Sequence, residues 1–245
     1  MVRTLLIAVL IATTNPLGQA GENNDRYRKQ CADIISAKGQ TNNADRLWKL
    51  FDENWDYRMV ASPESATWRG YPGQNDRWSD LSMQAIAEGK EDARLTLKAI
   101  LSFDRARLSK ADQLNYDLFR RNAEMEVERQ QFPAEFLAIN QMEGLPRDVP
   151  SMITMMPSAR TKDYENVLAR LSSISRLVDQ TIVLLQEGLT RGIVPPKVPL
   201  RTVADQVSGQ VHIGPMTTPM LSKFKKFPDT IPAAEQARLT EAAKA

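Results

Sequence analysis

The sequence predicts an all-α protein. Glycine is scarce, at 11 of 245 residues, and aromatic residues make up only 7%. Ala, Leu, Arg, Glu, Gln and Met are common, and alternating β-branched runs are few, which favours helices over strands. Apolar residues also recur at spacings of three and four, the period of a helix with one buried face. A chain of this length forms one large or two small domains and needs no disulfide or metal to hold its core.

The first 20 residues are typical of a signal peptide. Arg3 precedes an apolar run at 5–12, and Gly18 and Ala20 are small residues at the −3 and −1 positions of a cleavage site. The run is too short to span a bilayer, which takes about 20 residues. We therefore expect an exported chain, periplasmic or secreted, with a mature part at 21–245 and no stable membrane span. A buried first helix is the alternative.

Two helices are expected before residue 62. Asp25 can cap a helix over 25–38, which Gly39 ends. The next helix covers 43–61, where a stripe at helical spacing is broken by one polar residue; its members are Leu47, Leu50, Phe51, Asn54, Trp55 and Met59. The segment 62–80 is rich in turn formers and aromatic residues and reads as a loop.

Capping residues mark the next two helices. Ser82 can cap a helix that runs to about Phe103. Ser109 and Asp112 have the spacing of a capping box and open a helix to about Gln131. The following segment, 132–157, holds four prolines and no clean helical period, so we expect an extended segment there. Long non-helical segments are often functional, and a connector packed across helix ends is the equal alternative.

The longest helical region is predicted at 161–191. Thr161 can cap it, Ser172 and Ser173 can bend or split it, and Gly192 is a suitable residue just past its end. A shorter helix follows at 200–207. The last helix begins at Pro232 and meets no closing Gly, Asn or Pro, so we expect 21–245 to be truncated within that helix.

The residues offer little catalytic chemistry. A catalytic zinc site needs three protein ligands, but the chain has one histidine, His212, and one cysteine, Cys31. We expect His212 to be structural or merely exposed, Cys31 to be a small apolar filler, and no metal or catalytic residue to be present. The carboxylates at 52–53 and 124–128 are expected on solvated helix faces. The net charge of +2 gives no basic footprint for nucleic acid.

Five phrases carry a family resemblance. In chain order they are LFDENWDYRMVASPESATWRG, NDRWSDLS, LSKADQLNYDLFRR, INQMEGLPRDVPSMITMMP and TKDYENVLARLSSISRLVDQTIVLLQEGLTRGIVPPKV. Together they resemble the N-terminal part of the domain-of-unknown-function 885 family, bacterial and mostly helical proteins similar to gluzincin zinc metallopeptidases. The resemblance implies zinc and a His-Glu-x-x-His-type helix in the C-terminal half of full-length members, and therefore no cofactor in this chain.

The resemblance also implies a place for the chain in a larger fold. It would form the N-terminal half of a zinc-peptidase-like helical cleft, with Asn140 and Gln141 facing the cleft and binding a peptide backbone. The equal alternative is that these two side chains satisfy local backbone groups.

Two functions follow from this placement. The chain is either an inactive fragment of an exported peptidase-like hydrolase, whose partner is a peptide once a C-terminal half completes it, or a stand-alone helical peptide-binding or protein-interaction module. Apolar faces left open on the last helix and at Met152, Met155 and Met156 would favour self-association.

Overall fold

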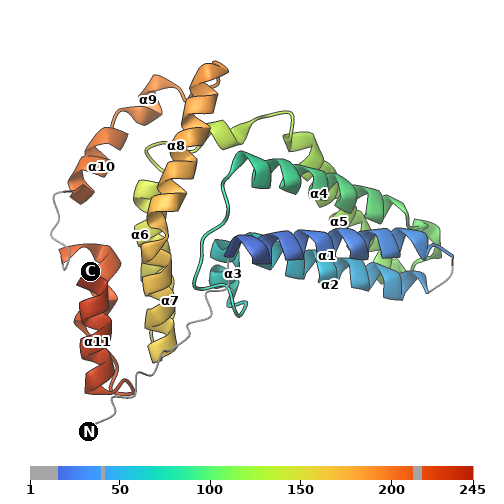
Figure 1. The fold of residues 1–245 in the computed structure, drawn as a ribbon. Helices are drawn as coiled ribbons and strands as arrows, with labels where there is room; N and C mark the ends of the chain where they lie inside the picture. The colour runs from blue at the N-terminus through green and yellow to red at the C-terminus, as the bar shows by residue number, and fades with distance from the viewer. Residues whose placement is uncertain (1–15, 40–41, 212–216, 245) are drawn as a thin grey trace, which may run out of the picture.

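The computed structural model describes residues 16–39, 42–211 and 217–244, and these residues are helical with no strand among them. The predicted all-α class is thus confirmed. Figure 1 shows two groups of helices arranged as the arms of a V. His212 and most of the predicted signal peptide lie outside the described residues, and helix α1 begins at Pro16. No described helix is long and apolar enough to cross a membrane.

The first group holds four helices in sequence-adjacent pairs. These are α1 (Pro16–Ser36), α2 (Asn43–Ala61), α4 (Met83–Leu101) and α5 (Lys110–Arg129). Helix α1 packs on both α2 and α4, and α5 packs on α4. The core between them is formed by Tyr27, Cys31, Ile34, Leu47, Leu50, Ala99, Ile100, Phe103, Leu108, Tyr116 and Ala123. Cys31 has no exposed surface, which confirms its prediction as an apolar filler.

The second group is built from α6 (Leu145–Met155), α7 (Thr161–Ser172), α8 (Ile174–Thr190), the 3-10 helix η4 (Pro219–Lys225) and α11 (Ala233–Lys244). Its core contains Trp78, Val149, Met152, Ile153, Met156, Tyr164, Val167, Leu177, Leu221, Phe224, Ile231 and Leu239. The short helices α9 (Lys197–Leu200) and α10 (Val203–Val211) follow α8 and lead back toward α6.

Helix α3 (Pro63–Arg69) and the segment 70–82 join the two groups. Arg170 of α7 is fully buried against this segment. Its guanidinium donates to the carbonyls of Pro63, Gln74 and Arg77 and to the Thr67 hydroxyl, at 2.8–3.1 Å. Trp78 returns a hydrogen bond from Nε1 to the Arg170 carbonyl, 2.9 Å away. Arg170 therefore attaches α7 to this segment, and Gln180 of α8 adds hydrogen bonds with Asp80 and with the Leu81 amide.

The predicted caps of α4 and α5 are confirmed, whereas Asp25 lies inside α1, which begins at Pro16, and does not cap it. Ser82 caps α4 by accepting from the Ala85 amide, and Ser109 caps α5 by accepting from the Asp112 amide. The region 161–191 is split at Ser173 into α7 and α8. The cap of α7 was wrongly predicted as Thr161. The capping residue is Arg160, whose amide donates to the Asp163 carboxylate.

Other expectations are corrected. The segment 132–157 is not extended throughout, because the 3-10 helix η2 (Ala134–Leu137) and α6 occupy much of it. Part of the predicted loop 62–80 is helix α3. The apolar faces expected to be open are also largely covered: Met152 and Met156 are buried, and Leu239 of α11 has no exposed surface because α11 packs on α7 and η4.

Candidate substrate groove between helices α2, α4 and α5

Two cavities, of about 780 and 400 Å³, lie between α2, α4 and α5. They share five lining residues: Asn54, Arg58, Thr96, Glu126 and Arg129. Because the cavities have a common lining, they form one elongated depression, which we call the α2–α5 groove. Its size is in the range of sites that bind small molecules or a few peptide residues.

The groove exists because α1 and α5 cover different parts of the first group. Helix α1 packs on both α2 and α4, and α5 packs mainly on α4. Helices α2 and α5 approach where Phe51 packs against Phe119, with ring centroids 4.7 Å apart, and where Trp48 Nε1 donates to Asp112. Beyond this contact, α4 and the buried Asn54 of α2 form the floor of the groove.

Asn54 in the floor is held in one orientation by a chain of hydrogen bonds. The Thr96 hydroxyl donates to the Asp92 carbonyl, 2.8 Å away, so the Tyr27 hydroxyl must donate to Thr96, 2.7 Å away. Tyr27 therefore accepts from Asn54 Nδ2 at 2.8 Å. The amide nitrogen of Asn54 is thus used inside the helix group, and its oxygen is a free acceptor among the described residues.

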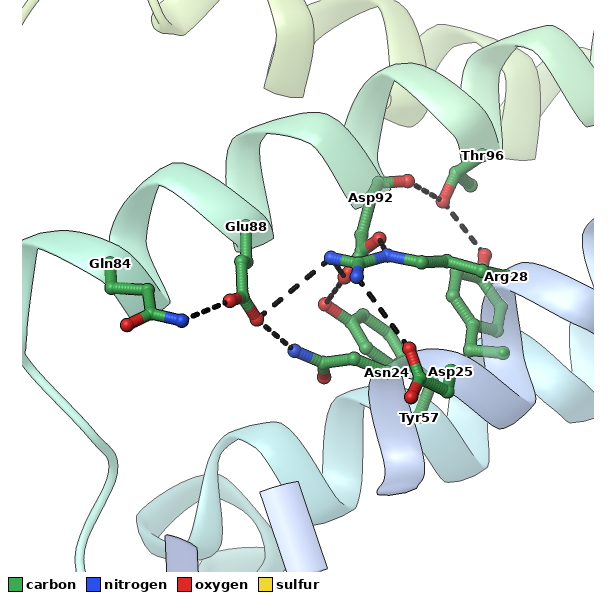
Figure 2. A network of polar contacts seen from close by, with 9 residues as sticks. Asn24, Asp25, Arg28, Tyr57, Gln84, Glu88, Asp92 and Thr96 are labelled. Carbon is green, nitrogen blue, oxygen red and sulfur yellow. Dashed lines mark hydrogen bonds and ion pairs between the residues drawn. The ribbon is translucent and has the colours of Figure 1, made fainter. Parts of the chain in front are cut away.

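A polar network behind the floor fixes the helices that carry it (Figure 2). The Asp92 carboxylate, only 1% exposed, accepts from Arg28 Nε at 2.6 Å and Nη2 at 3.2 Å and from the Tyr57 hydroxyl at 3.0 Å. Glu88 accepts from Asn24 and Gln84 and lies 3.9 Å from Arg28. The network thus joins α1, α2 and α4.

The two tyrosines of this network stay protonated at neutral pH. Burial raises the pKa of Tyr27 and of Tyr57 well above the usual value, and the neighbouring Asp92 carboxylate raises that of Tyr57 further. Neither hydroxyl is therefore tuned for acid–base work near pH 7. Their role is to position Asn54 and Asp92.

Charged side chains line the rim. Arg58 Nη1 donates to Glu126, 2.8 Å away, and Lys90 pairs with Glu135. Arg129, the last residue of α5, lines both cavities and has no carboxylate partner among the described residues. Glu126 was expected on a solvated face; it is exposed but belongs to the rim.

Gln130 adds a second free acceptor. Its Nε2 donates to the Lys90 carbonyl at 2.9 Å, whereas its Oε1 is buried and has no partner. The described residues hold no group of three His, Cys, Asp or Glu side chains placed to bind a metal ion.

Asn140 and Gln141, the predicted cleft residues, lie in the turn before α6 and do not line the groove. Asn140 Oδ1 accepts from the amides of Met142 and Glu143 at 2.8 and 3.0 Å, as in the alternative of local backbone satisfaction. Gln141 is exposed, and its carbonyl accepts from Gln206 Nε2. Sequence reasoning missed the groove residues, although Asn54 was visible as the polar break in the α2 stripe.

A family match is found for most of the chain. No curated protein is similar in sequence to the chain. Residues 63–245, most of the chain, match a family described as bacterial protein of unknown function. The match includes α3 to α11 and, within the groove, the residues contributed by α4 and α5. The chain therefore belongs to the DUF885 family.

Proposed function

We propose that the chain is the N-terminal, peptide-binding part of an exported hydrolase similar to zinc metallopeptidases, and that it is inactive in hydrolysis by itself. Peptide binding is assigned to the α2–α5 groove. The observation that carries this proposal is the floor of the groove, where Asn54 is about nine-tenths buried and its amide oxygen has no partner among the described residues. The zinc ligands and the general base are assigned, from the family resemblance, to a C-terminal half.

A peptide suits the groove because its backbone alternates donors and acceptors. Asn54 Oδ1 is a free acceptor that a ligand N–H can bind, and a neutral hydrogen bond of this kind contributes about 0.5–1.5 kcal/mol. The charged rim offers partners of both signs, and the half-exposed Trp55 and exposed Phe132 offer apolar contact for side chains. A purely apolar ligand would displace water from the Asn54 oxygen without replacing its hydrogen bond.

A substitution that places a larger side chain in the α2–α5 groove tests whether peptides bind there. Gly89 of α4 lines the smaller cavity, and no heavy atom lies within 4 Å of a Cβ built on it. Gly89→Leu therefore inserts a side chain without a backbone clash and improves helix propensity. The matched control is Gly209→Leu, at a helical glycine that is equally unobstructed but exposed on α10.

The readout is fluorescence anisotropy of labelled peptides with the full 245-residue chain. We expect Gly89→Leu to weaken binding on the order of tenfold, which corresponds to about 1.4 kcal/mol, and Gly209→Leu to leave it unchanged. No peptide should be hydrolysed, with or without added zinc. If the unmodified chain binds no peptide, or if both variants behave alike, the groove is not a peptide site.

A stand-alone interaction module is the second candidate, and one observation favours it. Helix α8 exposes Ile182, Val183 and Leu189, which are 45%, 51% and 72% exposed. Beside Ile182, a hollow of about 230 Å³ opens between α6, α8 and α10. Light scattering of the chain and of Ile182→Glu tests whether this face mediates self-association. A monomer at all concentrations would remove self-association from this proposal.

A further inference from the structure

We propose that the α2–α5 groove binds the carboxyl-terminal end of a peptide, with the terminal carboxylate on Arg129 and backbone N–H groups on Gln130 and Asn54. This assignment rests on the proposed peptide binding and names its substrate class. It follows from three polar groups of the groove that lack partners among the described residues: one cation and two amide oxygens.

Arg129 is the cation of the proposed site. Three basic side chains line the smaller cavity, namely Arg58, Lys90 and Arg129. Arg58 is neutralised by Glu126 and Lys90 by Glu135. Arg129 alone has no carboxylate partner in the described part of the chain. Arg129 is exposed at the rim, and its guanidinium fork matches a carboxylate in a two-bond geometry. It is therefore the group of this cavity best suited to a peptide carboxylate.

The amide oxygens of Gln130 and Asn54 are the acceptors of the proposed site. Gln130 follows Arg129 in the chain, and its Nε2 is fixed by the Lys90 carbonyl. The opposite amide orientation would place two oxygens against each other, so Oε1 must be the unpaired atom. Asn54 is held likewise by Tyr27. Gln130 Oε1 is buried without a partner, and Asn54 Oδ1 is a free acceptor; a peptide N–H can donate to each. A peptide terminus supplies a carboxylate for Arg129 and backbone N–H groups for the two oxygens, whereas a fully deprotonated inorganic anion supplies no donor.

The charge distribution gives the groove a direction. Asp52 of α2 is exposed, lines only the larger cavity, and has no basic partner in the described residues. A carboxylate is favoured beside Arg129 and a cation beside Asp52. The peptide should therefore run with its carboxyl end in the smaller cavity and its preceding residues toward Asp52.

The experiment compares peptides that differ only at the terminus. One sequence, labelled on an internal lysine, is prepared as the free acid and as the C-terminal amide, and each form is titrated with the full chain by anisotropy. We expect the acid to bind on the order of tenfold more tightly than the amide, the effect typical of one charge-assisted contact. Acetylation of the peptide amino end should not alter this preference.

Three variants assign the preference to its residue. Arg129→Gln should equalise acid and amide binding, whereas Arg129→Lys should keep part of the preference, because it retains the charge without the fork. Arg107→Gln is the matched control: Arg107 is exposed in the 3-10 helix η1 (Arg105–Arg107) and lines neither cavity. It should keep the full preference. Thermal unfolding checks that each variant is folded.

The outcomes separate the two proposals. If the unmodified chain binds acid and amide equally, the terminal assignment is wrong and peptide binding stands. If inorganic phosphate competes while acid and amide remain equal, Arg129 is a general anion site and the assignment is again overturned. A preference that survives in Arg129→Gln also overturns it. Absence of binding by every peptide would instead remove the proposed function.

Discussion

Replacing Arg170 with methionine should destabilise the joint between the two helix groups. The substitution keeps an unbranched apolar stem but removes the guanidinium, which donates to three carbonyls and one hydroxyl of α3 and the segment after it. It also removes the cation that lies 5.1 Å from the Trp78 ring centroid. The segment 63–78 then loses its main polar attachment to α7.

The magnitude follows from what is left unpaired. The buried Gln74 carbonyl is left without a donor among the described residues, at a cost of about 1–3 kcal/mol. The Pro63 carbonyl keeps the Thr67 hydroxyl as a donor but loses a hydrogen bond to a charged group, about 1.5–3 kcal/mol, which gives roughly 2.5–6 kcal/mol together. Part of this is recovered, because the guanidinium itself is costly to bury: desolvation lowers the pKa of Arg170 to about 10. We expect a net loss of about 2–4 kcal/mol in the free energy of unfolding.

Urea unfolding of the full chain measures this loss as a lower midpoint at an unchanged slope. The urea midpoint of Arg170→Lys should lie between those of Arg170→Met and the native chain, since an ammonium cannot reach all four acceptors. Arg201→Met, at an exposed position without an ion pair among the described residues, should change stability by less than about 0.5 kcal/mol. A stability for Arg170→Met within 1 kcal/mol of the native chain, about the scale of a single hydrogen bond, would refute the proposed role of this arginine.

Three further predictions concern single residues. Gly188→Ala should lower the melting temperature, with a cost of about 1–3 kcal/mol, because its Cβ would lie 2.7 Å from the Ile193 carbonyl oxygen. Asp92→Asn should cost about 1.5–3 kcal/mol in urea unfolding, since Arg28 loses its charge partner; an unchanged midpoint would contradict this. Burial raises the pKa of the Cys31 thiol to about 11, so iodoacetamide at pH 8 should label only the unfolded chain. Because the folded pKa exceeds the ordinary value of 9.0, the stability that Cys31 contributes is complete below pH 9 and declines toward pH 11; Cys31→Ala should remove this component from the pH profile.

Helix positions were predictable where the signal is local. Ser82 and Ser109 sit beside the amides that they cap, and the α2 stripe repeats within a few residues. Helix α6 was missed because its prolines concealed a helical pattern. Pro146 lies in the first turn, where its missing N–H is tolerated. The buried residues at 149, 152, 153 and 156 nevertheless keep a spacing of three and four.

The groove could not be predicted because its determinants are distant in sequence. Asn54 is oriented by Tyr27, which lies on another helix. Arg129 stands out only by comparison, because Arg58 and Lys90 of the rim form ion pairs with Glu126 and Glu135. Amino-acid composition and hydrophobic periodicity indicate neither the orientation of Asn54 nor the ion pairs of the rim. The same holds for Arg170, whose acceptors lie about 93–107 residues earlier in the chain.

The distance in sequence between Arg170 and its acceptors sets an order in which the helices can pack during synthesis. The helices of the first group, which end at Arg129, can pack as soon as that residue has left the ribosome. Helix α3 and the segment to Trp78 emerge earlier, but their docking residue follows Pro63 by 107 positions. A nascent chain that stops between Arg129 and Arg170 should therefore carry a packed first group with an undocked, protease-sensitive α3. Pulsed proteolysis of stalled chains would detect this stage.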